Sequence, residues 1–433
     1  MAGIMAETQR TRNPKIIIAV TCCVFFWFLM GPASLFTVYP RDAEGAEFRI
    51  VPFITVGEEY NDNVFLARYN KQEDYITRLF PGFNLTSRSS LFDLNLDLAY
   101  DYRYYANGTK KGDNTADINF RDHSELVKSL FFVDVLDTYQ RVSLSTTTNF
   151  ATQSSFVNQT DQNIFDLNPY FVMRNETRYT PILGYKYVNT WYKESTGGIS
   201  TVDNIGYAEM ITDLSSTMTF TTGVRYTHDT NSVQSYDKTD VYAGPKHTYA
   251  PNSYVYLLIG ESFLNFQHVN GTTKHVIWDA GITHRYSTMV LAYQMKSDYI
   301  PDPLLILRRE DKYVATLAKE TIRTSYSVLA GLFEYRNAAT NHLENTTYRL
   351  TGTLRHTVDP TLTLVLTENI ERQEDDVTDI IISLWESSVR LERRVLTDTI
   401  LALEYRYTNS YSHDIYLDNY VNNRLIVELT KRF

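Results

Sequence analysis

The stretch Phe92–Tyr104, FDLNLDLAYDYRY, alternates apolar and polar side chains along its whole length. Its even-numbered positions are Phe, Leu or Tyr, and its odd-numbered positions are Asp, Asn, Ala or Arg. Successive side chains of a strand point to opposite faces, whereas a helix would spread these apolar residues around its circumference. A long strand with one apolar and one charged face is typical of a barrel wall that has lipid outside and water inside.

Composition supports the same fold class. The 433 residues include 33 Tyr and 22 Phe but only 8 Met, which fits strands with interfacial aromatic belts better than a packed soluble core. A formal net charge of −10 argues against a nucleic-acid-binding protein. The mean hydropathy of −0.30 argues against a helical membrane bundle, whereas a barrel needs apolar residues only at alternate positions.

The N-terminal segment has the features of a signal peptide. Arg10, Arg12 and Lys15 precede an apolar run at 16–30, which is short for a spanning helix and normal for a signal-peptide core. We expect cleavage between residues 33 and 46, which leaves residues 1–45 as the signal peptide and 46–433 as the barrel. The alternative is an uncleaved anchor. The two cysteines, 22 and 23, lie inside this run, so the mature chain would have neither a disulfide nor a cysteine-ligated metal.

After residue 46 the chain alternates strands and connections. Counting hairpins predicts an antiparallel up-and-down transmembrane β-barrel of about 20 strands, with a range of 16–22. Short turns are expected at 88–90, 213–216, 251–253, 359–361 and 396–398, and longer polar connections at 61–74, 106–114, 142–162, 228–238, 297–310 and 408–418. Short turns on the periplasmic rim and long loops outside are the pattern of bacterial outer-membrane barrels. Alternation slips at 130–139 and 378–394, where we expect bulges.

Inward-facing charge is where a transport function would reside. The alternation predicts that ten charged residues line the lumen, either as a salt-bridged plug of side chains or as the wall of a wet channel: Asp93, Asp97, Asp101, Arg103, Arg225, Glu368, Arg390, Glu392, Glu404 and Arg406. Tyr187, Tyr226 and Tyr405 are instead expected in the lipid-facing aromatic belts.

The last strand carries a second signal. Leu425, Val427, Leu429 and the C-terminal Phe433 share one face, which resembles the closing strand that the outer-membrane assembly machinery recognises. Lys431 departs from that pattern, because an apolar or aromatic residue is usual there. The resemblance implies that the barrel assembly machinery and outer-membrane lipid are partners.

The segment after the signal peptide resembles a known family. Tyr60, Asp62 and Asn63 match a "Y-x-D-N" element before the first outer loop, and Pro81 and Gly82 match a "P-G" element in the second strand. In these residues the chain resembles the PEP-CTERM system-associated outer-membrane proteins and related barrels of exopolysaccharide loci. The resemblance is specific over 51–105 and general elsewhere. It implies a link to extracellular polysaccharide or to surface-protein sorting, with polysaccharide or periplasmic export components as partners and no defined chemistry.

The same residues have simpler structural roles. Asp62 and Asn63 are expected to cap a turn through bonds to backbone N–H groups. The alternative is that Asp62 and Asp74 bind a divalent cation, although two oxygen ligands are too few alone. The acidic run 374–376 with Asp379 invites the same comparison and is expected to be solvated. No cofactor is predicted.

Catalysis has weak support. His228-Asp229 and His413-Asp414 lie near Ser or Thr residues in outer connections, where a surface hydrolase would need its base. Adjacent residues of an extended chain point in opposite directions, so neither pair defines a site. We therefore expect no enzyme. The prediction is an outer-membrane channel or secretion conduit. The alternatives are a general diffusion porin, a barrel sheath around a partner protein and, with less support, a surface hydrolase.

Overall fold

The computed structural model describes residues 47–144, 159–174, 178–193, 198–231, 233–267, 271–302, 307–412 and 419–433. The predicted signal peptide, its two cysteines and the His413-Asp414 pair lie outside the described residues. Residues 47–433 form one compact unit. No helix in the described ranges is long and apolar enough to cross a membrane.

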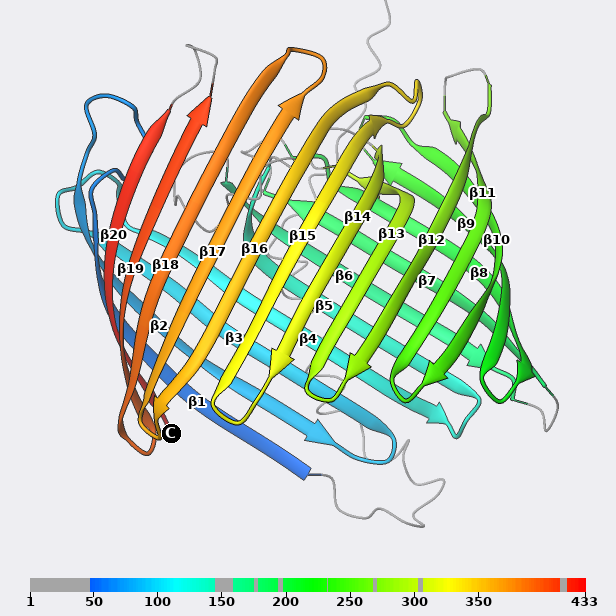
Figure 1. Ribbon diagram of the computed structural model, residues 1–433, viewed down its shortest axis with the longest axis horizontal. Coiled ribbons are helices and arrows are strands. Elements are labelled where there is room, and N and C mark those ends of the chain that lie inside the picture. The colour runs from blue at the N-terminus through cyan, green and yellow to red at the C-terminus, as the bar shows by residue number, and fades with distance from the viewer. Residues whose placement is uncertain are drawn as a thin grey trace, which may run out of the picture. The chain divides into compact units, whose positions relative to one another are not determined.

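Twenty strands form one antiparallel sheet in which each strand pairs with the next and β1 pairs with β20, so the sheet is closed (Figure 1). This confirms the predicted all-β barrel. The strands are β1 Glu47–Asn61, β2 Asp74–Arg88, β3 Phe92–Tyr105, β4 Asp113–Val127, β5 Phe131–Ser143, β6 Gln159–Val172, β7 Tyr179–Tyr192, β8 Thr201–Ser215, β9 Met218–Asn231, β10 Tyr236–Ala250, β11 Ser253–Phe266, β12 Thr273–Tyr286, β13 Met289–Pro301, β14 Leu307–Glu320, β15 Thr324–Asn337, β16 Leu343–Asp359, β17 Leu362–Asp375, β18 Ile380–Leu396, β19 Thr399–Ser412 and β20 Tyr420–Arg432.

Connections alternate between short and long as predicted. The short ones lie at one rim together with the start of β1 and the end of β20 (Figure 1). The predicted connections 228–238 and 297–310 are too long, because β9 continues to Asn231 and β10 begins at Tyr236, while β13 continues to Pro301. Ladder hydrogen bonds continue past the apolar belt, and polar residues can form them as well as apolar ones.

Register shifts occur beside several short turns. In the β4–β5 pair the shift lies between Glu125 and Val127, and in the β18–β19 pair it lies between Arg394 and Leu396. The expected bulge at 130–139 is not found, because that shift lies on β4, before the turn that precedes β5. The shift on β18 begins at the last residue of the expected region 378–394. A bulge at a hairpin end adjusts the twist without changing which residues face lipid.

Large apolar side chains cover the outer face. On β20, Leu425, Val427 and Leu429 share this face and are 42–47% exposed. Tyr226 and Tyr405 are similarly exposed on the same face of their strands, as predicted. A band of this kind is stable only against lipid, because water would otherwise contact a large apolar area.

Two hairpins bend into the lumen at the end of the barrel that carries the long connections. Within the described residues, the β4–β5 ladder stops at Ile118 and the β12–β13 ladder at Trp278, although β4 and β12 each extend further. Beyond these points, residues of β5 and β13 that belong to the outer-face series contact inward-facing groups. Arg141 Nη1 lies 2.6 Å from Asp113 Oδ2. The ends of β5–β6 and β13–β14 therefore overlap the inner surface of the preceding strands.

The second bent hairpin carries a small apolar cluster. Tyr299 and Leu307, from β13 and β14, pack with inward-facing Tyr236 and Leu264, from β10 and β11. All four are less than 7% exposed. The hairpins β5–β6 and β13–β14 lie eight strands apart in a closed sheet of 20, so they narrow the lumen from nearly opposite sides.

Candidate functional site

The inner wall of the barrel carries most of the predicted site residues. The inner face is the one opposite the exposed apolar side chains. Nine of the ten predicted lumen residues lie on it: Asp93, Asp97, Asp101, Arg103, Arg225, Arg390, Glu392, Glu404 and Arg406.

Glu368 is the exception, and its prediction was wrong. It belongs to the outer-face series of β17, which also includes Ile370, 46% exposed. Its carboxylate accepts hydrogen bonds from Trp385 Nε1 at 3.0 Å and Ser387 Oγ at 2.6 Å. Two donors on β18 thus hold the carboxylate on the outer face, a possibility that charge patterning along one strand cannot reveal.

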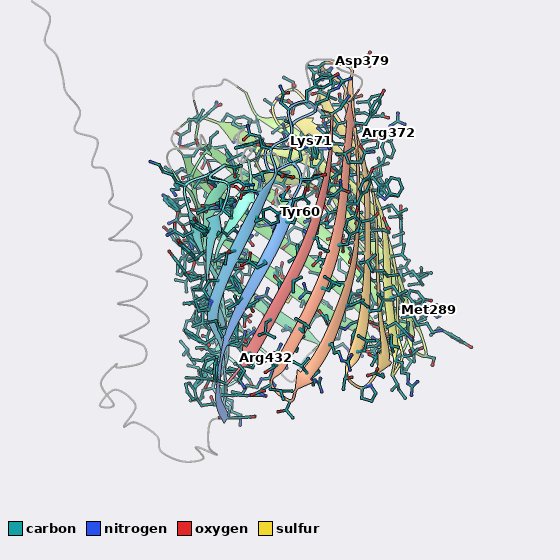
Figure 2. The ribbon with its side chains drawn as sticks, turned by 90° about the vertical axis from the view of Figure 1, so that its left-hand side faces the viewer. Tyr60, Lys71, Met289, Arg372, Asp379 and Arg432 are labelled. Carbon is teal, nitrogen blue, oxygen red and sulfur yellow. The ribbon has the colours of Figure 1, made fainter. Side chains whose placement is uncertain are left out.

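A chain of ion pairs crosses the place where β20 meets β1. Figure 2 shows these two strands side by side. We call the residues of this chain and its branches the seam wall: Glu59, Arg78, Asp101, Arg103, Arg390, Glu392, Glu404, Arg406, Arg424 and Glu428. Asp101 lies 2.8 Å from both Arg78 Nε and Arg103 Nη2. Glu428 lies 3.5 Å from Arg78 Nη1 and 2.9 Å from Arg390 Nη1. Charges from four strands are therefore neutralised along the wall.

The chain continues onto β19. Arg390 Nη1 lies 3.1 Å from Glu404 Oε2, and Arg406 Nη2 lies 2.7 Å from Glu404 Oε1. Arg424 on β20 forms a separate two-bond pair with Glu59 on β1, at 2.7 and 2.9 Å. Charge-assisted bonds of this geometry are stronger than single neutral hydrogen bonds.

Small residues allow the arginines to cross a strand. Gly57 on β1 is paired with Arg78 on one side and Glu428 on the other. A Cβ at Gly57 would lie 3.1 Å from Glu428 Cγ. Ala402 on β19 is 2% exposed and is paired with Glu392 on one side and Glu428 on the other, so it lies diagonally from Arg390. The long side chains thus lie against the wall rather than across the lumen.

The opposite part of the wall uses aromatic rings in the same way. Three inward-facing tyrosines are each paired directly with a glycine on the neighbouring strand, and a Cβ on that glycine would collide with the ring: Tyr207 with Gly184, Tyr242 with Gly223, and Tyr256 with Gly281. Each ring therefore lies over its glycine. We call these tyrosines, with Phe132 and Tyr170, the ring wall.

The tyrosine hydroxyls reach the strand beyond. Tyr207 OH donates to Asn168 Oδ1 at 2.9 Å, and Gln294 Nε2 donates to Tyr256 OH at 3.2 Å. Tyr242 OH donates to Glu209 Oε1. Each ring is consequently fixed at both ends, by the backbone of its own strand and by a polar group two strands away. Sequence patterning did not identify these rings as inward-facing, because the aromatic residues were assigned to the outer belts.

The family-motif residues fasten the seam at the outer rim. Asp62 accepts hydrogen bonds from the backbone N and from Nδ2 of Asn423, both at 2.7 Å. Asn63 is fully buried, and its Nδ2 donates to the carbonyl oxygens of Ala67 and Val421. Ala67 N donates to Asn63 Oδ1. Asn63 therefore caps a turn as expected, whereas Asp62 does not: it joins β1 to β20.

The remaining motif residues lie nearby on β1 and β2. Tyr60 OH donates to Glu73 Oε2 at 2.8 Å, at the same rim (Figure 2). Pro81 interrupts the β2–β3 ladder, which passes from Leu79 to Gly82, since proline has no N–H to donate. A Cβ on Gly82 would lie 2.5 Å from the Leu98 carbonyl oxygen. The "P-G" pair thus permits a close strand approach.

The carboxylates suggested as cation ligands are bound elsewhere. Asp74 accepts hydrogen bonds from the backbone N of Asn107 and Thr109, whereas Asp62 accepts its hydrogen bonds from Asn423. Asp375 accepts from the backbone N of Val377 and Thr378, as an ordinary turn residue does. No group of three or more acidic, His or Cys side chains suited to a metal occurs among the described residues.

His228 and Asp229 point in opposite directions, as expected for neighbours on a strand. His228 is on the outer face with its Nδ1 2.8 Å from Asp237 Oδ1, whereas Asp229 is buried on the inner face. They do not form one site. Thr230 offers a hydroxyl to His228, with its Oγ1 3.4 Å from His228 Nε2 on the outer face.

Lys431, the departure from the closing-strand pattern, has a partner in a short turn. Its Nζ lies 2.5 Å from Asp398 Oδ2 and 5.9 Å from the centre of the Phe433 ring. The hydrogen bond from Lys431 holds the pKa of the Asp398 carboxyl below its usual value. The cation therefore joins the end of β20 to the β18–β19 turn.

Comparison with known proteins identifies a fold and no family. No family model and no curated protein matches the chain. Among solved structures, the FrpB iron transporter from Neisseria meningitidis (F5-1 variant) has a TM-score of 0.52 at 7% identity, over 90% of this chain and 83% of that one. The siderophore receptor PirA from Pseudomonas aeruginosa has a TM-score of 0.47 at 9% identity, over 89% and 80%.

These likenesses concern architecture. A closed antiparallel sheet with an apolar outer band and a polar inner wall satisfies every strand in lipid, because closure leaves no unpaired edge. The chain is a transmembrane β-barrel of the Gram-negative outer membrane.

Proposed function

We propose that the barrel is a conduit for a polar polymer, within an exopolysaccharide or PEP-CTERM surface system. The observation that supports this most is where the inward-facing charges find their partners. Among the described residues, inward-facing ion pairs join strands no more than three positions apart around the barrel, and none crosses the lumen. The charges therefore line the wall instead of filling the interior.

Strand number agrees with this proposal. A barrel of 16 or more strands usually encloses a lumen, and this one has 20. A wall of charges and hydroxyls is wettable, and many of its charges are paired with a neighbouring strand, which limits their binding of a passing polymer. The motif residues at 60–63 and 81–82 supply the link to surface polysaccharide, by resemblance.

Planar-bilayer recordings test the conduit. We expect ohmic currents from the purified full chain, and reversible block when a long polysaccharide is added to the periplasmic side. A general diffusion porin would conduct without such block. A barrel without current would contradict both the conduit and the porin.

A matched pair of variants tests whether the current passes along the described wall. Glu404→Gln removes an inward-facing carboxylate and should lower the cation-to-anion permeability ratio by about twofold. Glu368→Gln makes the same chemical change on the outer face and should leave the ratio unchanged. Equal effects of the two would show that the current does not follow this wall.

A further inference from the structure

One row of inward-facing residues runs around the ring wall from strand to strand. Each member is paired directly with the next: Phe132, Tyr170, Gly184, Tyr207, Arg225, Asp240, Ser262 and His275. Phe132 lies beside a short turn, and His275 is near the long-connection end of β12. Because barrel strands are tilted, a row perpendicular to them climbs the wall. This row therefore joins the two rims of the barrel.

The lower part of the row is a series of aromatic faces. The Phe132 and Tyr170 rings are 5.4 Å apart with planes at 17°, and His123 stacks on Phe132 at 5.7 Å and 18°. Tyr207 follows, lying over Gly184. Phe132, Tyr170 and Tyr207 are half-buried and His123 is exposed, so each ring presents a surface to the lumen.

A recess of about 700 Å³ is lined by His123, and by Asp134 and Asn168, which are strand neighbours two residues from Phe132 and Tyr170. Its polar lining includes Asn95 and Asn168, and Asn168 Oδ1 also accepts the hydrogen bond from Tyr207 OH. The lining has three cations, Arg88, Arg121 and Lys186, and four carboxylates, Asp93, Asp122, Asp134 and Asp166.

The charges of the recess are largely satisfied within the wall. Lys186 Nζ lies 2.5 Å from Asp166 Oδ2, and Arg88 Nε lies 3.3 Å from Asp93 Oδ1. Asp134 Oδ1 lies 2.6 Å from His123 Nδ1. A ligand here would meet fixed hydrogen-bonding groups and aromatic faces beside charges of both signs.

We propose that this recess and the rings beside it bind a neutral carbohydrate chain that enters from the periplasmic side. A sugar ring has an apolar face of C–H groups and a rim of hydroxyls. Aromatic faces complement the first, and amides, carboxylates and ammonium groups complement the second. An acidic chain would meet four carboxylates against three cations, of which only Arg121 forms no ion pair with a described residue, so the lining favours a neutral chain over an acidic one. This inference rests on the proposed conduit and names its substrate class.

Calorimetric titration of the detergent-solubilised full chain tests the site without depending on current. The probes are maltohexaose and cellohexaose, two neutral hexasaccharides, and hexagalacturonate as an acidic one. We expect a neutral hexasaccharide to bind and hexagalacturonate to bind at least tenfold more weakly. Preference for the acidic probe, or no binding of either neutral one, would overturn the assignment.

Ring substitutions locate the binding. Tyr170→Leu and Tyr207→Leu should each weaken binding of the neutral probe about tenfold, because a stacking surface is lost. Tyr226→Leu is the matched control, since Tyr226 is on the outer face. Tyr207→Phe keeps the ring and should change affinity less than threefold. Correct folding of every variant is checked by heat-modifiable electrophoretic mobility.

The two proposals fail separately. A barrel that conducts but binds both neutral probes with unchanged affinity in the Leu variants would overturn the carbohydrate site and leave the conduit in place. A barrel that binds a neutral probe through Tyr170 and Tyr207 but passes no current would overturn the conduit. In that case the recess would be a binding site in a closed barrel.

Discussion

The seam wall and the ring wall both hold long side chains flat against the barrel, but they do so with different chemistry. In both, a long side chain crosses a small residue on the adjacent strand and bonds to the strand beyond. On the seam wall the long side chains are Arg78 and Arg390, which converge on Glu428. On the ring wall they are tyrosines lying over glycines, such as Tyr242 over Gly223. Each arrangement keeps bulky side chains against the wall.

The difference follows from what each wall must join. The ring wall connects strands that are neighbours in sequence and already share hairpin turns. The seam joins β1 to β20, the first and last strands of the sheet. Pairing them therefore closes a chain segment that contains all the other strands. Closing so long a loop costs chain entropy. At the seam, the Arg424–Glu59 ion pair, Asp62 and the buried Asn63 join the two ends of the sheet.

The largest expected effect is at Asn63, whose buried hydrogen bonds we call the seam lock. Asn63→Ala removes three hydrogen bonds from a fully buried position and leaves backbone groups of Ala67 and Val421 without that partner. We expect a loss of about 2 kcal/mol in the free energy of unfolding. Guanidinium titration in lipid vesicles, followed by tryptophan emission, measures it. The control is Asn204→Ala, which removes one exposed bond to Tyr185 OH. Similar losses for both variants would show that the seam has no special lock.

An intermediate effect is expected from the charged pairs of the seam wall. A double-mutant cycle of Arg390→Met and Glu428→Gln should give a coupling of about 1 kcal/mol at low salt, decreasing as salt rises, since both groups are partly accessible. The ring-wall pair Tyr256 and Asp279, tested with Tyr256→Phe and Asp279→Asn, should show a coupling that changes less with salt. A salt-independent cycle at the seam would remove the proposed contrast between the walls.

The smallest effect concerns the ion pair of Lys431 and Asp398, at the short-turn end of β20. Lys431 lowers the pKa of Asp398, so the folded state binds the ionised carboxylate better than the unfolded state does. The stabilisation is present above the ordinary aspartate pKa of about 4 and is lost as pH falls through the lowered value. The stability difference between wild type and Asp398→Asn should therefore be present at neutral pH and absent in strong acid. A difference that persists in strong acid would contradict this ion pair.

Much of the wall could be predicted from alternation alone. Phe92–Tyr104 places Asp101 and Arg103 on the inner face because neighbouring side chains on a strand must face opposite sides. The same rule failed at Glu368, where charge suggested the lumen and two donors on β18 hold the carboxylate outside. It also missed Tyr207 and Tyr242 as inward rings, since a tyrosine suits either face of a barrel.

The sequence by itself determined the strands, their faces and the alternation of short and long connections, because these depend on local periodicity and turn chemistry. Only the tertiary structure decided which charges meet. Asp62 reaches Asn423 and Arg78 reaches Glu428 across hundreds of residues. The bent hairpins and the row from Phe132 to His275 likewise exist only once the sheet closes, because closure sets the register between strands and brings the two ends of the chain together.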